Sequence, residues 1–150
     1  MSPPGYRHAR ASNWFAAALH AHGELAGHGE ACDEVGVLLR RNPDHLIGPD
    51  AAFIVSASLP PRVSPEGYLL TVPELVVEVR SKNDSLPEIE VKVRDYLAAG
   101  VVLVWVADPA ARTVTAHRPD LPPVISGAGD ALTADPVIPG FRVPVADLLP

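Results

Sequence analysis

Hydrophobic side chains recur along the chain with two spacings, and these spacings predict its secondary structure. Between residues 8 and 22, apolar side chains recur every three to four positions in an alanine-rich segment, which is typical of a helix with one buried face. Residues 75–80 begin with a nearly continuous apolar run, as a central strand does. The helical spacing returns over 86–99, and residues 101–107 are all apolar. A strand, a helix and a strand in this order predict a βαβ unit and therefore an α/β fold.

The helix expected over 86–99 has recognisable signals at both ends. Pro87 suits the first helical turn, where a backbone N–H has no partner, and Glu88 suits the positive end of the helix dipole. Gly100 is placed to end the helix. Lys92 lies on the margin of the apolar stripe. That stripe is expected to consist of Leu86, Ile89, Val93, Tyr96 and Leu97.

The rest of the chain predicts shorter elements. Three prolines make 58–66 a loop, and the prolines and glycines beyond Pro119 predict loops and a short edge hairpin. Further strands are expected at 34–40, 50–55 and 112–117. Because aromatic side chains bury large areas, the core is expected to contain Trp14, Phe15 and Trp105.

Composition and charge narrow the class of protein. A length of 150 residues suits a single domain, 1–150, and 47% hydrophobic residues argue against disorder. The net charge of −6 argues against a protein that coats nucleic acid, but it permits an enzyme that meets DNA through a local basic patch. A lone cysteine, Cys32, excludes an internal disulfide and a cysteine-rich zinc site. With no signal peptide and no apolar run near the ~20 residues that span a membrane, we expect a cytoplasmic protein.

Three ionisable residues stand where a buried sheet does not favour them. Asp50 opens one expected strand, Glu78 interrupts another, and Lys92 lies at the edge of a helix face. A carboxylate in a buried strand is costly unless it is paired or binds a metal. Two carboxylates brought together repel each other, and a hard divalent cation relieves that repulsion. With a lysine nearby, this set suits metal-assisted hydrolysis of a phosphodiester.

The same residues also permit a purely structural interpretation. Glu78 would pair with Arg80 or Lys82 at the end of its strand. Asp50 would cap a turn, and Lys92 would extend into solvent. Spacing alone favours this interpretation, because an Asp, a Glu and a Lys in such an order occur easily by chance.

Several segments, in order along the chain, resemble one known family. They are Gly48 to Ile54, Pro73 to Ser81, Asp84, Lys92, Tyr96 to Val101, Val104 to Val106, Asp108-Pro109 and Pro139 to Val145. Together they resemble the Uma-type putative restriction endonuclease family of the PD-(D/E)XK nuclease superfamily. The resemblance implies a restriction-endonuclease-like core, in which helices flank a mixed central sheet. It also implies a Mg²⁺- or Mn²⁺-dependent endonuclease that hydrolyses DNA, with a homodimer as one form of assembly.

Residue by residue, the resemblance gives the unusual side chains specific roles. It makes Asp50 and Glu78 the metal ligands and, together with Lys92, the catalytic residues. Lys92 takes the place of a lysine two positions after the glutamate, where this chain has Arg80. Arg80 and Lys82 become candidates for phosphate contact, with solvated loop charges as the alternative. Two further matching residues are expected to shape the loop before the helix, namely Ser81 and Asp84.

The first residues of the chain depart from the family pattern. Family members usually begin with a hairpin that bears a glutamate, whereas this chain starts almost at the first helix, near Tyr6, so we expect either that the hairpin is missing or that the true start lies upstream. His8 matches a family histidine at the helix start, and an exposed helix-end histidine is the equal alternative. A second hypothesis is therefore a non-catalytic binding or interaction module with the nuclease fold. If the chain is a nuclease, its acidic balance means that DNA contact would come from local basic residues such as Arg7, Arg10, Arg40, Arg41, Arg80 and Lys82.

Overall fold

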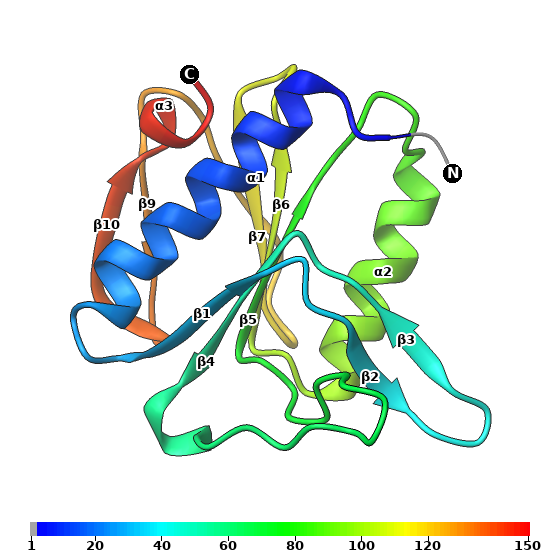
Figure 1. The fold of residues 1–150 in the computed structure, drawn as a ribbon. Helices are drawn as coiled ribbons and strands as arrows, with labels where there is room; N and C mark the ends of the chain where they lie inside the picture. Colours follow the sequence, from blue (N-terminus) through cyan, green and yellow to red (C-terminus); the bar gives the residue numbers. More distant parts are fainter. Residues whose placement is uncertain (1–2) are drawn as a thin grey trace.

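The centre of the protein is a six-stranded mixed sheet, seen in a computed structural model that describes residues 3–150 (Figure 1). Its strand order is β1-β4-β5-β6-β7-β8. Strands β5 and β6 pair in parallel, and each other neighbouring pair is antiparallel. The strands are β1 (Gly29–Asp33), β4 (Ala51–Val55), β5 (Leu75–Val79), β6 (Leu103–Asp108), β7 (Thr113–His117) and β8 (Val124–Ser126). The expected mixed central sheet flanked by helices is therefore confirmed.

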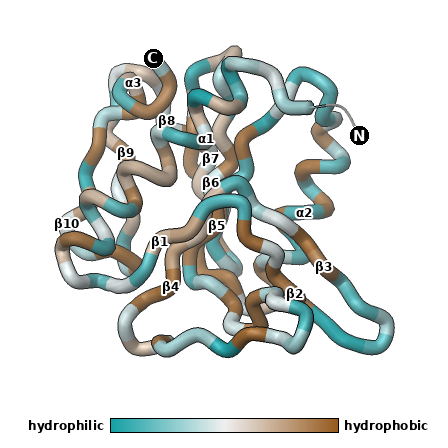
Figure 2. The backbone as a smooth tube through the Cα atoms, in the orientation of Figure 1, coloured by the Kyte–Doolittle hydropathy of each residue, from teal (hydrophilic) through white to brown (hydrophobic). Residues whose placement is uncertain are grey.

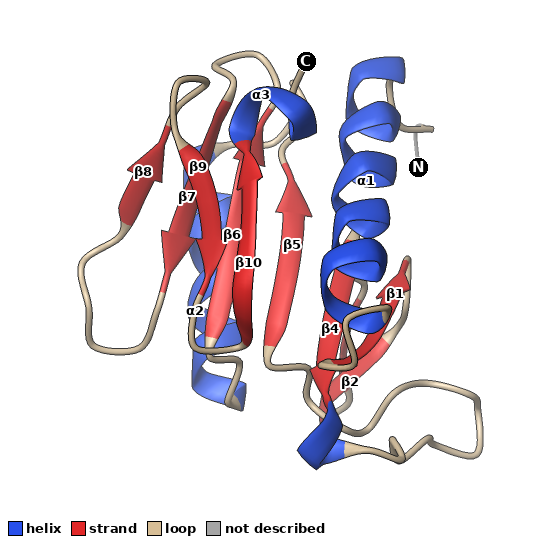
Figure 3. Ribbon diagram, turned by 90° about the vertical axis from the view of Figure 1, so that its left-hand side faces the viewer, coloured by secondary structure: helices blue, strands red, loops and turns tan. Residues whose placement is uncertain are grey.

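Helices cover the two faces of this sheet. Figure 3 looks at the face that carries α1 (Tyr6–Leu19), with α2 (Leu86–Ala99) behind the sheet. Helix α1 continues into a π-helical turn, His20–Glu24. The remaining elements are β2 (Val37–Arg40), β3 (His45–Ile47), a 3₁₀ turn at Ser56–Ser58, β9 (Ala131–Ala134), β10 (Ile138–Pro144) and α3 (Val145–Leu148). No helix within residues 3–150 has the length and apolar character that crossing a membrane requires.

Strand β5 separates two hydrophobic cores, because its side chains alternate between the faces of the sheet. Val77 and Val79 belong to the core under α1, which also contains Phe15 and Trp105. Val76 belongs to the core under α2. We call these the α1-side core and the α2-side core. Figure 2 shows the hydrophobic character of the central strands beside the hydrophilic turn between β2 and β3.

Helix α2 agrees with the expectation at both ends. The Ser85 hydroxyl accepts a hydrogen bond from the backbone N–H of Glu88, and Gly100 ends the helix with a φ of 110° that favours glycine. The expected stripe is largely confirmed, with Ile89, Val93 and Tyr96 buried. Leu86 is exposed, contrary to the expectation. Helical side chains lean toward the N-terminus, so the first residue of a helix projects past the sheet that it would cover.

Three other expectations were wrong. Strand β1 was missed because the sequence of this sheet-edge strand has no apolar alternation, and of the strand expected over 34–40 only β2 forms. The expected C-terminal hairpin does form, as β9 and β10, but it is a separate two-stranded sheet in the α1-side core and not an edge of the central sheet. Trp14 is 38% exposed, whereas Trp105 is fully buried. Trp14 adjoins buried Phe15, and neighbouring helix positions face different directions.

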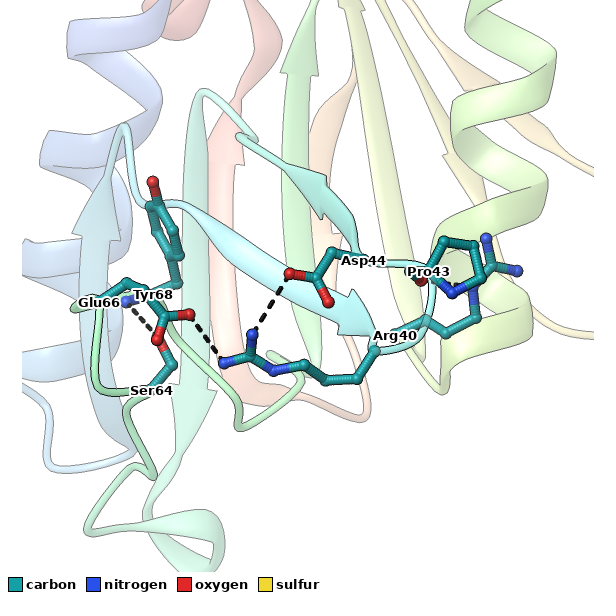
Figure 4. A network of polar contacts seen from close by, with 7 residues as sticks. Arg40, Pro43, Asp44, Ser64, Glu66 and Tyr68 are labelled. Carbon is teal, nitrogen blue, oxygen red and sulfur yellow. Dashed lines mark hydrogen bonds and ion pairs between the residues drawn. The ribbon is translucent and has the colours of Figure 1, made fainter.

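Polar contacts fasten the β2–β3 hairpin to the segment before β5 (Figure 4). One Arg41 amino group donates to Glu66 at 2.8 Å, and the other donates to Asp44 at 3.3 Å. Nearby, the backbone N–H of Tyr68 donates to the Ser64 hydroxyl at 3.0 Å. All three charged side chains are exposed. We call Arg41, Asp44 and Glu66 the exterior network.

Candidate active site

The structure brings the three unusual ionisable side chains together at one end of the sheet. Asp50 directly precedes β4, and Glu78 lies near the end of β5. Because these strands are antiparallel, the start of β4 lies beside the end of β5. Lys92 reaches the same place from α2, and its Nζ lies 3.6 Å from Oε2 of Glu78. Residues that are far apart in sequence therefore form a single cluster.

Glu78 is almost completely enclosed, with 6% of its side chain exposed. Its Oε1 accepts a 2.6 Å hydrogen bond from the Tyr96 hydroxyl, and its Oε2 faces Lys92. Burial raises the pKa of Glu78, and the negative charge of Asp50 raises it further, while Tyr96 and Lys92 act against the rise. The fold thus holds this carboxylate where a charge is costly and gives it only partial compensation.

Asp50 is held by the neighbouring strand β5 and by helix α1. Its Oδ2 accepts a 2.7 Å hydrogen bond from the backbone N–H of Val79, and its Oδ1 lies 3.5 Å from Nε2 of His8. Although 20% of the side chain is exposed, burial is the main cause of a raised pKa for Asp50. The Val79 hydrogen bond, His8 and Lys92 act against that rise. Both carboxylates are therefore partly desolvated and fixed in orientation.

Two residues complete the site in ways that sequence reasoning did not assign. Tyr96 was expected only as a core residue, yet its hydroxyl contacts Glu78. Its position four residues after Lys92 places both side chains on one helix face, which is a usable signal. Burial and the nearby carboxylates raise the pKa of Tyr96, so its hydroxyl remains a donor. His8 contacts Asp50 and is mostly buried, so the exposed helix-end alternative was wrong; its Nδ1 is buried with no hydrogen-bond partner within residues 3–150.

The basic residues that follow β5, Arg80 and Lys82, do not form ion pairs with the carboxylates of the cluster. Arg80 turns toward β6, where its Nη1 lies 3.4 Å from Oδ2 of Asp108, so it does not pair with Glu78 as the structural interpretation proposed. Lys82 is exposed and has no ion pair within the part of the chain that the structure describes. Asp84 accepts a 2.9 Å hydrogen bond from the N–H of Ser81 and so closes the loop before α2, as expected.

The donor atoms of the site suit a hard divalent cation. Asp50 and Glu78 offer carboxylate oxygens, and their mutual repulsion favours a bound positive charge. Within residues 3–150, no group of three or more His, Cys, Asp or Glu side chains is arranged to hold a metal ion. Mg²⁺ is commonly bound by one or two carboxylates, with water and substrate phosphate as its other ligands. The pair fits that kind of binding and does not resemble an all-protein cage.

Comparisons with known proteins show the family and the fold of this chain. A family model described as Uma2, putative restriction endonuclease, matches residues 1–146. Among solved structures, the chain is similar to a putative nuclease belonging to DUF820 from Anabaena variabilis, with a TM-score of 0.81 and 19% sequence identity over 99% of this chain and 83% of that one. At this identity the likeness shows the fold alone. No curated protein matches the sequence. The family match supports a nuclease-like role.

Proposed function

We propose that this chain, which belongs to the Uma2 family of putative restriction endonucleases, is a divalent-metal-dependent endonuclease that hydrolyses DNA phosphodiester bonds. One observation carries the proposal: the fold places two desolvated carboxylates, Asp50 and Glu78, beside the ammonium group of Lys92. Ionisable groups whose pKa values are shifted by burial and by a neighbouring charge are typical of catalytic sites. A purely structural ion pair would need only one of the two carboxylates.

Asp50 and Glu78 would hold Mg²⁺ or Mn²⁺. When bound, such a cation neutralises charge on the scissile phosphate and lowers the pKa of a nearby water. Lys92 would supply positive charge at the same point, where it can orient the attacking water and stabilise the charge that develops on the phosphate. Its position beside Oε2 of Glu78 keeps the ammonium group within the site without burying it completely.

The surrounding residues would orient the two carboxylates. Tyr96 fixes Oε1 of Glu78, and the backbone N–H of Val79 fixes Oδ2 of Asp50. His8 restrains the other oxygen of Asp50 from α1, which covers the face of the sheet opposite to α2 and Tyr96. Groups held in this way need little rearrangement during the reaction, which is the main contribution of a preorganised site. Lys82 is the better candidate for phosphate contact, because Arg80 is already paired with Asp108.

Calorimetry with Mn²⁺, together with a plasmid cleavage assay, tests this function. We expect the wild type to bind Mn²⁺ and to cut DNA only when Mg²⁺ or Mn²⁺ is present. Glu78→Gln should lose both properties, because it removes the charge while keeping the shape of the side chain. Glu90→Gln, the same change at an exposed position of α2, is the matched control and should lose neither.

Two outcomes would count against the proposal. Metal binding that survives Glu78→Gln would place the cation elsewhere in the protein. Metal binding without cleavage of any DNA or RNA substrate would favour the alternative of a non-catalytic module that keeps the nuclease fold.

A further inference from the structure

The outward side of α1 combines exposed aromatic rings with arginines. Tyr6 is 82% exposed, Trp14 is partly exposed, and the Arg10 guanidinium lies over the Trp14 ring, 5.4 Å from its centroid. Arg7 is exposed as well. At 100° per residue these four positions share the side of α1 that is opposite His8 and the buried Phe15. We call Tyr6, Arg7, Arg10 and Trp14 the α1 outer face.

The charge of this face differs from that of the protein as a whole. The chain carries a net charge of −6, yet its first 23 residues contain no Asp or Glu. Within residues 3–150, neither Arg7 nor Arg10 forms an ion pair, whereas Arg41 and Arg80 both do. The α1 outer face is therefore a local source of positive charge that no carboxylate neutralises.

The same part of α1 adjoins the candidate active site. His8, which follows Arg7 in the chain, contacts Asp50. Figure 1 shows the first turns of α1 at the same end of the molecule as the end of β5 and the start of α2. From Tyr6 to Trp14 the helix rises by about 12 Å, at roughly 1.5 Å per residue. The α1 outer face points away from His8 and Asp50, so a strand bound there would lie on the outside of the helix whose inner side contacts the site.

We propose that the α1 outer face binds single-stranded nucleic acid on the outside of the helix that borders the active site, an inference that rests on the proposed nuclease function. Exposed rings stack on bases, and unpaired arginines attract phosphates; together they form the usual surface for single strands. In a duplex the faces of the bases are covered by their neighbours, so Trp14 can stack only on unpaired bases. The substrate class would thus be a single strand or the unpaired part of a duplex.

A protein partner is the other occupant that Trp, Tyr and Arg residues suggest, because all three are common in protein interfaces. The charge distribution favours the polyanion: Arg7 and Arg10 stand without neutralising carboxylates in an otherwise acidic protein. The experiment below includes the protein partner as one of its outcomes, in the form of a second copy of this chain.

Tryptophan fluorescence can test this proposal directly, because the chain has two tryptophans in different environments. Trp14 is exposed and Trp105 is fully buried, so a base that stacks on the surface can quench only Trp14. The full chain is titrated with a thymidine oligonucleotide, single-stranded or annealed to its complement, in EDTA and low salt. Since no metal is present, binding is measured independently of cleavage.

We expect the single strand to quench the emission and to bind more tightly than the duplex. Trp14→Ala should abolish the quenching and weaken binding by about 5- to 100-fold, whereas Trp14→Phe should retain most of the affinity. Arg10→Ala should reduce the slope of log K against log salt by about 0.7, the value for one phosphate contact on a single strand. Arg62→Ala, at an exposed position far along the chain, is the matched control and should leave that slope unchanged.

Other results would overturn the inference. Equal or tighter binding of the duplex would remove the single-strand assignment, and binding without quenching would place the nucleic acid elsewhere. No binding, combined with a change in sedimentation on Trp14→Ala, would show that the face contacts a second copy of the chain. If the wild type binds and is quenched by the oligonucleotide but cuts no nucleic acid, the nuclease function fails and the binding of single strands by the α1 outer face remains.

Discussion

Two polar networks of this protein differ in their burial and in how their charges are balanced. In the exterior network, the positive Arg41 lies between two negative carboxylates, those of Asp44 and Glu66. All three side chains are exposed to water. At the active site, two like-charged carboxylates are mostly buried and share one ammonium group, that of Lys92. The exterior network fastens one hairpin, and isolated exposed pairs of this kind add little to stability.

The difference supports the proposal that the carboxylate cluster has a function beyond folding. Burial of like charges opposes folding, and a hydrophobic or neutral residue would be more stable at either position. The fold nevertheless surrounds Asp50 and Glu78 with a tyrosine, a backbone N–H and a histidine that hold their oxygens in place. Rigid support for an unfavourable arrangement is typical of a site that was selected to bind something.

The largest effect should come from neutralising one carboxylate of the site. We expect Asp50→Asn to lower the rate of DNA cleavage by about 10²–10³-fold, a typical loss when a group that stabilises the transition state is removed. In metal-free buffer the same variant should be as stable as the wild type or more stable, because a charge repulsion is gone. Cleavage assays and thermal melts measure the two effects.

The control is Asp120→Asn, the same change at an exposed turn. An Asp50→Asn protein that is destabilised but still active would contradict this expectation.

The next largest effect should come from the single cation of the site. Lys92→Met removes the ammonium group that faces Glu78 and should lower the cleavage rate by about 10²-fold. Without that ammonium group, the pKa values of Asp50 and Glu78 should rise further, so the variant should melt earlier than the wild type at neutral pH. Arg94→Met, on an exposed part of the same helix, should change neither property. Full activity of Lys92→Met would remove the lysine from the mechanism.

The buried carboxylates should also give stability a specific pH dependence. Burial raises the pKa of Asp50 and of Glu78, so the folded protein holds their protons more tightly than the unfolded chain does. The stability linked to these protons is complete below the ordinary carboxyl pKa of about 4 and is lost as the pH rises through the raised values. A double variant, Asp50→Asn with Glu78→Gln, should therefore exceed the metal-free wild type in stability at neutral pH.

That advantage should shrink as the pH falls, and urea unfolding at a series of pH values measures it. Taking the difference between the two proteins cancels the titration of the other carboxylates. An advantage that grows on acidification would mean that the two carboxylates stabilise the fold.

The smallest effect is expected at the exterior network. Arg41→Ala removes both ion pairs of that network, yet the charges are exposed and solvated in either state. The thermal midpoint and the cleavage rate should stay at their wild-type values. A clear fall in the midpoint would show that the exterior network supports the hairpin more strongly than its exposure indicates.

Secondary structure was predicted best where the residues that determine an element lie within that element. Helix α2 was located at its observed ends because a proline, an acidic first turn and a terminal glycine mark it within the segment itself. Strand β1 was missed because an edge strand needs little apolar character, and its pairing with β4 is set by the rest of the sheet. The position of β9 and β10 in the α1-side core likewise depends on contacts between distant segments.

The residues of the candidate site also differ in whether a local sequence signal identifies them. Asp50, Glu78 and Lys92 attract attention in the sequence because charged residues interrupt apolar patterns. The contacts of His8 and Tyr96 arise only when α1 and α2 approach the same strand end from opposite faces. Tyr96 is also an ordinary member of an apolar stripe, so its hydroxyl gives no signal until its partner is known.

The separation of the two cores by β5 has a consequence for how the protein tolerates substitutions. The α1-side core supports α1 and therefore His8 and Asp50, while the α2-side core supports α2 and therefore Tyr96, Lys92 and Glu78. A substitution that shifts one helix displaces the side chain that directly contacts one carboxylate and leaves the direct contact of the other in place. A displacement of α1 or of α2 can therefore be compensated by repacking the core under that helix, without rebuilding the whole site.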